Sequence, residues 1–226
     1  EQAAVAHFNR DVATRIPPLR GTRVVFDYMI HGPACAGVRA RRALVATQID
    51  RLAEQRPRPH VLSIAAGHLR EASLSVAVRR RRTGRMLALD ADPMSLEEVR
   101  ASYGGLGVET ETASFRHLLH KDRYREEFDF VYSTGLFDYL SLRSGRRLVQ
   151  AMHRMVRPGG SFLIANFLPG IRDVGFMEAI MDWTLVYRSR QDMIDLTQDL
   201  PESGIKRLEL WSEEALNILF LRITKP

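Results

Sequence analysis

Residues 61–71 of the chain read VLSIAAGHLRE, in which four residues typical of a buried strand precede three small residues and the start of a helix. In an open sheet of parallel strands, ligands bind beyond the carboxyl ends of the strands. Small side chains at Ala65, Ala66 and Gly67 let the backbone approach such a ligand, and a helix that follows directs N–H groups toward it. The segment therefore predicts a binding loop on an α/β fold.

Short apolar segments alternate with helical ones on the C-terminal side of this loop. The expected strands cover residues 61–64, 86–89, 108–112, 128–132 and 161–165, and the expected helices cover 71–82, 93–103, 115–120 and 144–156. This alternation predicts a mostly parallel sheet covered by helices on both faces. The last two apolar segments, 205–211 and 217–224, have too little chain between them for a crossover, so that pair is expected to be antiparallel.

The length of the chain suits one domain with additional elements. It has 226 residues, more than a typical domain but fewer than two. Residues 1–59 are predicted to form an N-terminal helical cap, because a helix over 38–55 ends at Pro57 and Pro59. Residues 60–226 form the expected main domain, with a helical insertion at about 170–200.

Composition excludes several classes of protein. Hydrophobic residues make up 45% and charged residues 27% of the chain, as in soluble globular proteins, and no apolar run approaches the ~18 residues of a membrane span. The single cysteine, Cys35, and the lack of a signal-peptide pattern predict a cytoplasmic protein. The histidines have no metal-ligand spacing, so no metal is expected. The sequence does not predict an oligomeric state.

The residues that follow the other strands narrow the class of ligand. Asp90 lies 23 residues after Gly67, and an acid about 20 residues beyond the glycine turn suits the hydroxyls of a ribose. Phe115 follows the third strand, where an adenine can lie against it. The first turn lacks two of the three glycines that favour a pyrophosphate. A nucleoside with an amino-acid tail, as in S-adenosylmethionine, is therefore expected rather than a dinucleotide.

Taken with the Pro158-Gly159-Gly160 turn and the terminal hairpin, these features resemble the class I S-adenosylmethionine-dependent methyltransferases. The resemblance covers roughly residue 61 to the C-terminus. It implies a Rossmann-like sheet of seven strands in the order 3-2-1-4-5-7-6, with strand 7 antiparallel, and S-adenosyl-L-methionine as cofactor. It places Ala65, Ala66 and Gly67 along the methionine part of this cofactor, Asp90 at the ribose, and Ser114 and Phe115 beside the adenine. Further candidates for cofactor binding at the same strand ends are Glu71, Ala91, Thr134 and Gly135, although Glu71 can instead interact with the dipole of the helix that it begins.

Two motifs carry a narrower resemblance. Residues 128–141, FDFVYSTGLFDYLS, and residues 182–188, DWTLVYR, look like a bacterial subgroup that includes proteins for making 3-hydroxypalmitic acid methyl ester. This resemblance implies a small-molecule methyl acceptor, with a carboxylate or a hydroxy acid as the candidate class.

The candidates for the acceptor side follow the fourth and fifth strands or precede the first. A carboxylate acceptor needs a positive clamp, for which Arg188 is the candidate, whereas a hydroxyl or amine acceptor needs a general base. We expect residues 28–31 and 183–188 to meet above the carboxyl ends of strands four and five and to cover the pocket. The candidate catalytic residues are Asp138, Tyr139 and His31, and the candidate substrate-binding residues are Tyr28, Trp183, Tyr187 and Arg188.

Other interpretations compete with these. The altered first turn is also compatible with an inactive methyltransferase fold that serves as a binding or assembly subunit, since fold does not fix function. The net charge of +6 suits a nucleic-acid methyltransferase, but the arginine run at 79–82 has no interleaved aromatic residues, so a nucleic-acid partner is not expected. Asp90 can instead cap a helix, Asp138 and Tyr139 can form a buried pair, and Arg188 can make a surface salt bridge.

Overall fold

A single seven-stranded sheet forms the centre of the computed structural model, which describes residues 27–28, 30–119 and 123–226. The strand order is β3-β2-β1-β4-β5-β7-β6, and β7 runs antiparallel to both of its neighbours. The predicted order and the antiparallel terminal hairpin are therefore confirmed. The strands are β1 (His60–Ile64), β2 (Arg85–Asp90), β3 (Val108–Thr112), β4 (Phe128–Ser133), β5 (Val156–Phe167), β6 (Arg207–Ser212) and β7 (Ile218–Thr224).

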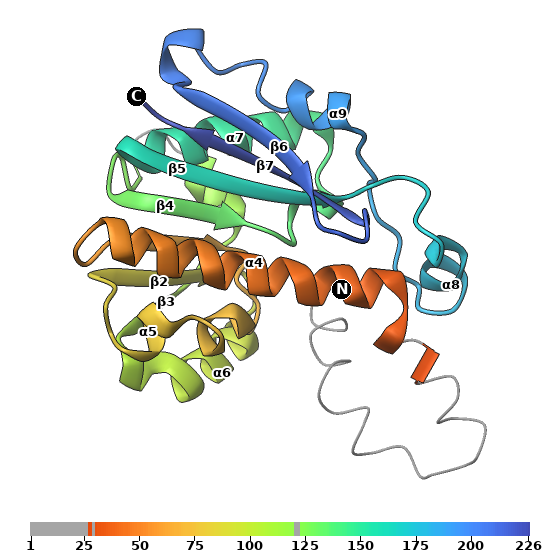
Figure 1. Ribbon diagram of the computed structural model, residues 1–226, viewed down its shortest axis with the longest axis horizontal. Coiled ribbons are helices and arrows are strands. Elements are labelled where there is room, and N and C mark those ends of the chain that lie inside the picture. The colour runs from red at the N-terminus through yellow and green to blue at the C-terminus, as the bar shows by residue number, and fades with distance from the viewer. Residues whose placement is uncertain (1–26, 29, 120–122) are drawn as a thin grey trace.

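Helices cover both faces of the sheet, as Figure 1 shows. One hydrophobic core lies between the sheet and α4, α5 and α6, and a second lies on the opposite face under α7 and α9. Because both faces are covered, all six residues of β4 are buried, which is typical of a parallel sheet. The helices are α4 (Pro33–Gln55), α5 (Val76–Arg79), α6 (Pro93–Tyr103), α7 (Leu142–Met155), α8 (Val174–Ala179) and α9 (Arg190–Asp195).

Helix α4 is the element that brings the N-terminal part of the chain to the candidate site. It begins with Pro33 in its first turn and ends before Pro57, and it crosses the middle of the sheet (Figure 1). A Cβ atom added at Gly37 would lie 3.2 Å from Asn217 and Ile218, so glycine permits close packing of the helix against β7. Since the chain passes from α4 almost directly into β1, the first half of α4 lies at the carboxyl-end edge of the sheet.

The helix expected over residues 71–82 is interrupted. A 3-10 turn covers Arg70–Ser73, and α5 begins only after Ser75. The carboxylate of Asp50, on α4, accepts hydrogen bonds from the Ser75 hydroxyl and from the first two backbone N–H groups of α5. This tertiary cap stabilises a new helix start where the sequence pattern alone predicts a continuous helix.

The late insertion also differs from the expected helices over 175–200. Helices α8 and α9 are short, and residues 183–189 between them are not helical. The N–H of Val186 donates to the carbonyl of Asp138 at 2.7 Å, and that of Arg188 donates to the carbonyl of Phe167 at 3.0 Å. These bonds hold the segment against the turn after β4 and the end of β5. A helix would use the same N–H groups for its own hydrogen bonds, so the segment cannot be helical and keep these contacts.

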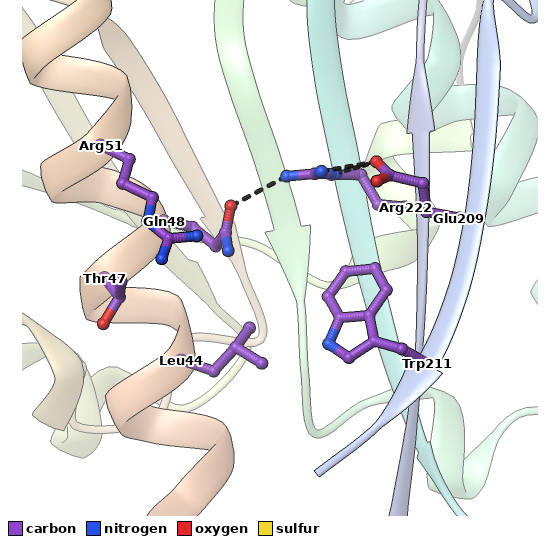
Figure 2. Close-up of a pocket in the computed structure, with 7 residues that line it drawn as sticks. All are labelled: Leu44, Thr47, Gln48, Arg51, Glu209, Trp211 and Arg222. Carbon is purple, nitrogen blue, oxygen red and sulfur yellow. Dashed lines mark hydrogen bonds and ion pairs between the residues drawn. The ribbon is translucent and has the colours of Figure 1, made fainter.

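A hollow of about 400 Å³ lies between α4 and the β6–β7 hairpin (Figure 2). Within it the Arg222 guanidinium pairs with the Glu209 carboxylate and donates to the Gln48 side chain. The hollow lies over the β6–β7 edge of the sheet, whereas the predicted site lies at the ends of β1, β2 and β4.

No helix among the described residues is long and apolar enough to cross a membrane. The helical cap predicted for residues 1–59 lies partly outside the described residues.

Candidate functional site

The loop after β1 has an unusual backbone that opens toward the edge of the sheet. Ala65, Gly67 and Leu69 all have φ between 50° and 54°, the left-handed region that residues other than glycine rarely adopt. The N–H of Ala66 donates to the carbonyl of Leu89, at the end of β2. A Cβ atom added at Gly67 would meet no atom within 4 Å, so the backbone at Gly67 borders open space that a ligand can enter.

Asp90 fixes this loop against the end of β2. Its side chain is buried, with 5% of the residue exposed, and its two carboxylate oxygens accept the N–H groups of Gly67 at 2.8 Å and of Asp92 at 2.9 Å. Each oxygen keeps a further lone pair for a hydroxyl donor. Asp92, rather than Asp90, caps α6 by accepting the N–H groups of residues 94 and 95, so the interpretation of Asp90 as a helix cap is wrong.

The other predicted cofactor residues lie at the same edge. Ala91 is the first residue after β2, and Ser114 is the second residue after the neighbouring strand β3. The Ala113 N–H joins these two strand ends by donating to the Asp90 carbonyl. Phe115 is half-buried against the second core. Thr134 and Gly135 follow β4, whose last residue, Ser133, donates its hydroxyl proton to the carbonyl of Ile64 in β1. The structure thus brings the ends of β1, β2, β3 and β4 together.

Asp138 lies buried on the short turn after β4. One carboxylate oxygen accepts the N–H of Phe167 at 2.8 Å, which ties this turn to the end of β5. Burial raises the pKa of Asp138 to about 6, against the opposing effects of Arg41, the Phe167 N–H and Arg188. A carboxyl group with this pKa can exchange a proton near neutral pH.

A carboxyl–hydroxyl pair, formed by Glu71 after β1 and Tyr132 in β4, lies near Asp138. Tyr132 donates its hydroxyl proton to Glu71 at 2.6 Å. Burial raises the pKa of Glu71, and the Tyr132 hydroxyl, Arg41 and Arg42 oppose this rise. Burial and the neighbouring Glu71 carboxylate raise the pKa of Tyr132 well above 10. Glu71 therefore lies in the site with one of its oxygens already engaged.

Arg41, on α4, was not among the predicted site residues, and it interacts electrostatically with both Asp138 and Glu71. Its Nη1 lies 3.6 Å from Oδ2 of Asp138, is buried and makes no hydrogen bond. Burial lowers the pKa of Arg41, whereas Asp138 and Glu71 raise it. Helical periodicity indicated the helix, but a single sequence gave no sign of which of its arginines faces the strand ends.

Of the aromatic residues proposed to bind the acceptor, Trp183 contacts Tyr139. Trp183 donates its indole N–H to the Tyr139 hydroxyl at 2.8 Å and packs edge-on against Phe167. Tyr139 is 40% exposed, so it is not part of a fully buried pair with Asp138. Burial and the neighbouring Glu178 raise the pKa of Tyr187 to about 12. Trp183 and Tyr139 thus form a hydrogen-bonded aromatic pair beside Asp138.

The N-terminal segment contacts the late insertion at α8. Tyr28 is 59% exposed and packs edge-on against Phe176 of α8, with ring centroids 5.4 Å apart. The predicted meeting of residues 28–31 with residues 183–188 above the strand ends stays a prediction. Nδ1 of His31 lies 2.7 Å from the carbonyl oxygen of Asp27, a local contact, and its role as a base stays a prediction.

Arg188 lies beside the Asp138 turn, but its guanidinium is engaged by the protein. The residue is 3% exposed. Nη1 donates to the carbonyl of Phe137 and to the side chain of Asn166, and Nη2 donates to the carbonyl of Leu140. These bonds correct the expected role of Arg188 as a clamp for an anionic acceptor, and they also exclude a surface salt bridge. Arg188 instead cross-links the turn after β4 to β5.

Comparison with known protein families finds one family model that matches part of the chain. The model of a methyltransferase domain matches residues 61–160, the segment from β1 into β5 that contains Gly67, Asp90 and Asp138. No curated protein matches the sequence significantly.

Solved structures share the fold at low sequence identity. A possible exported protein from Bordetella parapertussis is 18% identical, with a TM-score of 0.74, over 98% of this chain and 79% of that one. A methyltransferase from Thermotoga maritima, described as a possible histamine N-methyltransferase, is 13% identical, with a TM-score of 0.57, over 88% and 92%. NodS, an N-methyltransferase from Bradyrhizobium japonicum solved with S-adenosyl-L-homocysteine, is 16% identical, with a TM-score of 0.55, over 80% and 85%.

Proposed function

We propose that this protein is an S-adenosyl-L-methionine-dependent methyltransferase that acts on a small molecule. The observation that carries the proposal is the bond between the Asp90 carboxylate and the Gly67 N–H, within the segment that matches the methyltransferase domain. It sets an acid with free lone pairs beside an open left-handed loop. This arrangement suits a nucleoside that carries an amino-acid tail.

The residues present fit S-adenosyl-L-methionine at each part of the molecule. Asp90 holds the ribose hydroxyls through its remaining lone pairs. Ser114 and Phe115 flank the adenine, and the loop from Ala65 to Gly67, with Glu71 and Gly135, lines the methionine part. No atom lies within 4 Å of a Cβ atom added at Gly67, which leaves the backbone there accessible to the ligand.

The cofactor supplies a methyl group that its sulfonium already activates. The protein therefore has to align the acceptor, exclude water and accept a proton where the acceptor carries one. Asp138 would take the proton from an acceptor hydroxyl. Trp183 and Tyr139 form the wall that positions the acceptor. The engaged Arg188 removes the argument for a carboxylate clamp, so we favour the hydroxyl of a hydroxy acid as the methylated group.

The rate of transfer should depend on the ionisation of Asp138. Because only the carboxylate form accepts a proton, we expect kcat/KM for the acceptor to rise with pH through about 6, which is the pKa of Asp138. Asp138→Asn keeps an acceptor for the Phe167 N–H but removes the base, so we expect a loss of about 100-fold or more. The measurement is the formation of S-adenosyl-L-homocysteine with a hydroxy-acid acceptor selected from a panel, at saturating cofactor.

Glu71→Gln is the control for this pH profile, since the pKa of Glu71 is also raised. We expect the inflection near pH 6 to persist in Glu71→Gln. A flat profile in the wild type, with Asp138→Asn fully active, would contradict the base and would favour methylation of a carboxylate, as in the subgroup that makes 3-hydroxypalmitic acid methyl ester.

A further inference from the structure

Arg41 presents a cationic group with one buried nitrogen, Nη1, that donates no hydrogen bond to the described residues. Nη1 is shielded from solvent and has no hydrogen-bond partner, and the nearest carboxylate oxygen, on Asp138, is 3.6 Å away. A buried donor without a partner destabilises the fold, and a charged donor does so more strongly. Buried polar groups without partners are rare in native proteins, so this one indicates that an acceptor is supplied by a ligand.

The surroundings of Arg41 define where that acceptor lies. Nη2 is 3.8 Å from the point where a Cβ atom of Gly135 would be, so the guanidinium faces the backbone after β4. Glu71, after β1, is near enough to affect the pKa of Arg41. The guanidinium therefore borders the ends of β1 and β4, whereas Asp90 lies at the end of β2, on the far side of β1 from β4.

The two neighbouring carboxylates do not occupy the N–H groups of Arg41. Glu71 accepts the Tyr132 hydroxyl, and Asp138 accepts the Phe167 N–H. Burial raises the pKa of Glu71 and so favours its neutral form, whereas Asp138, with a pKa of about 6, is charged at neutral pH and balances one guanidinium. The adjacent Arg42 has a buried Nε, also without a hydrogen-bond partner. An additional anion is thus compatible with the charges at this place.

We propose that Arg41 binds the α-carboxylate of the methionine part of S-adenosyl-L-methionine, an inference that rests on the proposed function. With the ribose at Asp90, the place beside the loop at Gly67, at the ends of β1 and β4, would receive the amino-acid tail. Arg41 borders this point. A planar guanidinium matches a carboxylate with two parallel hydrogen bonds.

The test compares two ligands that differ only in the carboxylate. We expect wild-type protein to bind S-adenosyl-L-methionine at least tenfold more tightly than decarboxylated S-adenosylmethionine in equilibrium titrations. In Arg41→Gln, affinity for the intact cofactor should fall at least tenfold, whereas affinity for the decarboxylated ligand should change less than twofold. The preference for the carboxylate is thereby lost, and circular dichroism checks that the variant is folded.

Arg51→Gln is the matched control. Arg51 lies on the same helix, about 15 Å along its axis from Arg41, and is exposed at the hollow of Figure 2, so its loss should leave both affinities unchanged. Arg41→Lys should retain part of the preference for the intact cofactor over the decarboxylated ligand. This variant provides a second test if Arg41→Gln does not fold.

Three results would overturn the inference. Equal weakening of both ligands would make Arg41 a structural residue. Unchanged affinity for both would remove it from the cofactor site, and a rise in the acceptor KM alone would assign it to the acceptor. Wild-type protein that binds neither ligand would instead overturn the proposed function, so the two failures are distinguishable.

Discussion

Replacement of Asp90 by alanine is expected to weaken the binding of S-adenosyl-L-methionine by about 100-fold or more. Asp90 accepts the Gly67 N–H and has lone pairs left for the two ribose hydroxyls. A hydrogen bond to a charged group contributes about 1.5–3 kcal/mol, so loss of two such bonds corresponds to about 3 kcal/mol or more. The loop at Gly67 also loses its tether, which acts in the same direction. Isothermal titration calorimetry measures the change.

Asp92→Ala is the control for this variant. Asp92 caps α6 through the N–H groups of residues 94 and 95, so its loss should cost about 1 kcal/mol of stability and leave cofactor affinity within a factor of about three. An Asp90→Ala protein that is folded and binds the cofactor as tightly as the wild type would rule out the ribose role.

Arg188→Ala is expected to reduce the free energy of unfolding by about 3 kcal/mol or more. The guanidinium donates to the Phe137 and Leu140 carbonyls and to the Asn166 side chain, and its removal leaves these buried acceptors without that donor. Each such loss costs about 1–3 kcal/mol, and a cavity adds to the cost. Urea unfolding of the variant and the wild type gives the difference.

Arg190→Ala, two residues along the chain, is the control: it removes an exposed arginine, so it shows the effect of losing the charge without losing buried contacts. Arg190 is exposed and donates to the Leu210 carbonyl at 3.2 Å, so its loss should change stability by less than about 1 kcal/mol. If Arg188→Ala proved as stable as Arg190→Ala while transfer to the acceptor fell, Arg188 would be a clamp after all.

The sequence predicted the sheet well for physical reasons. Strands buried on both faces, such as β4, are short apolar runs that stand out from the helices around them. The interrupted helix after residue 70 was not predictable in the same way. Its second start depends on Asp50, which belongs to another element and comes more than twenty residues earlier in the chain.

The site was predictable only where the chemistry follows directly from a strand end. Gly67 and Asp90 are fixed by the short loops that follow β1 and β2, so spacing along the chain was sufficient. Arg41 and Arg188 depend on how α4 and the late insertion pack over the sheet. In a chain rich in arginine, no local pattern distinguishes a guanidinium with a free buried N–H group from one that donates to carbonyl groups.

Equilibrium binding of S-adenosyl-L-homocysteine to the wild-type protein tests the central claim most directly. The product carries the same ribose, adenine and α-carboxylate as the cofactor, and it needs no knowledge of the acceptor. The arrangement of Asp90, the loop at Gly67 and Arg41 predicts saturable binding of one molecule per chain, with a dissociation constant of about 100 µM or less, equivalent to about 5.5 kcal/mol. No detectable binding by folded protein at millimolar ligand would contradict it.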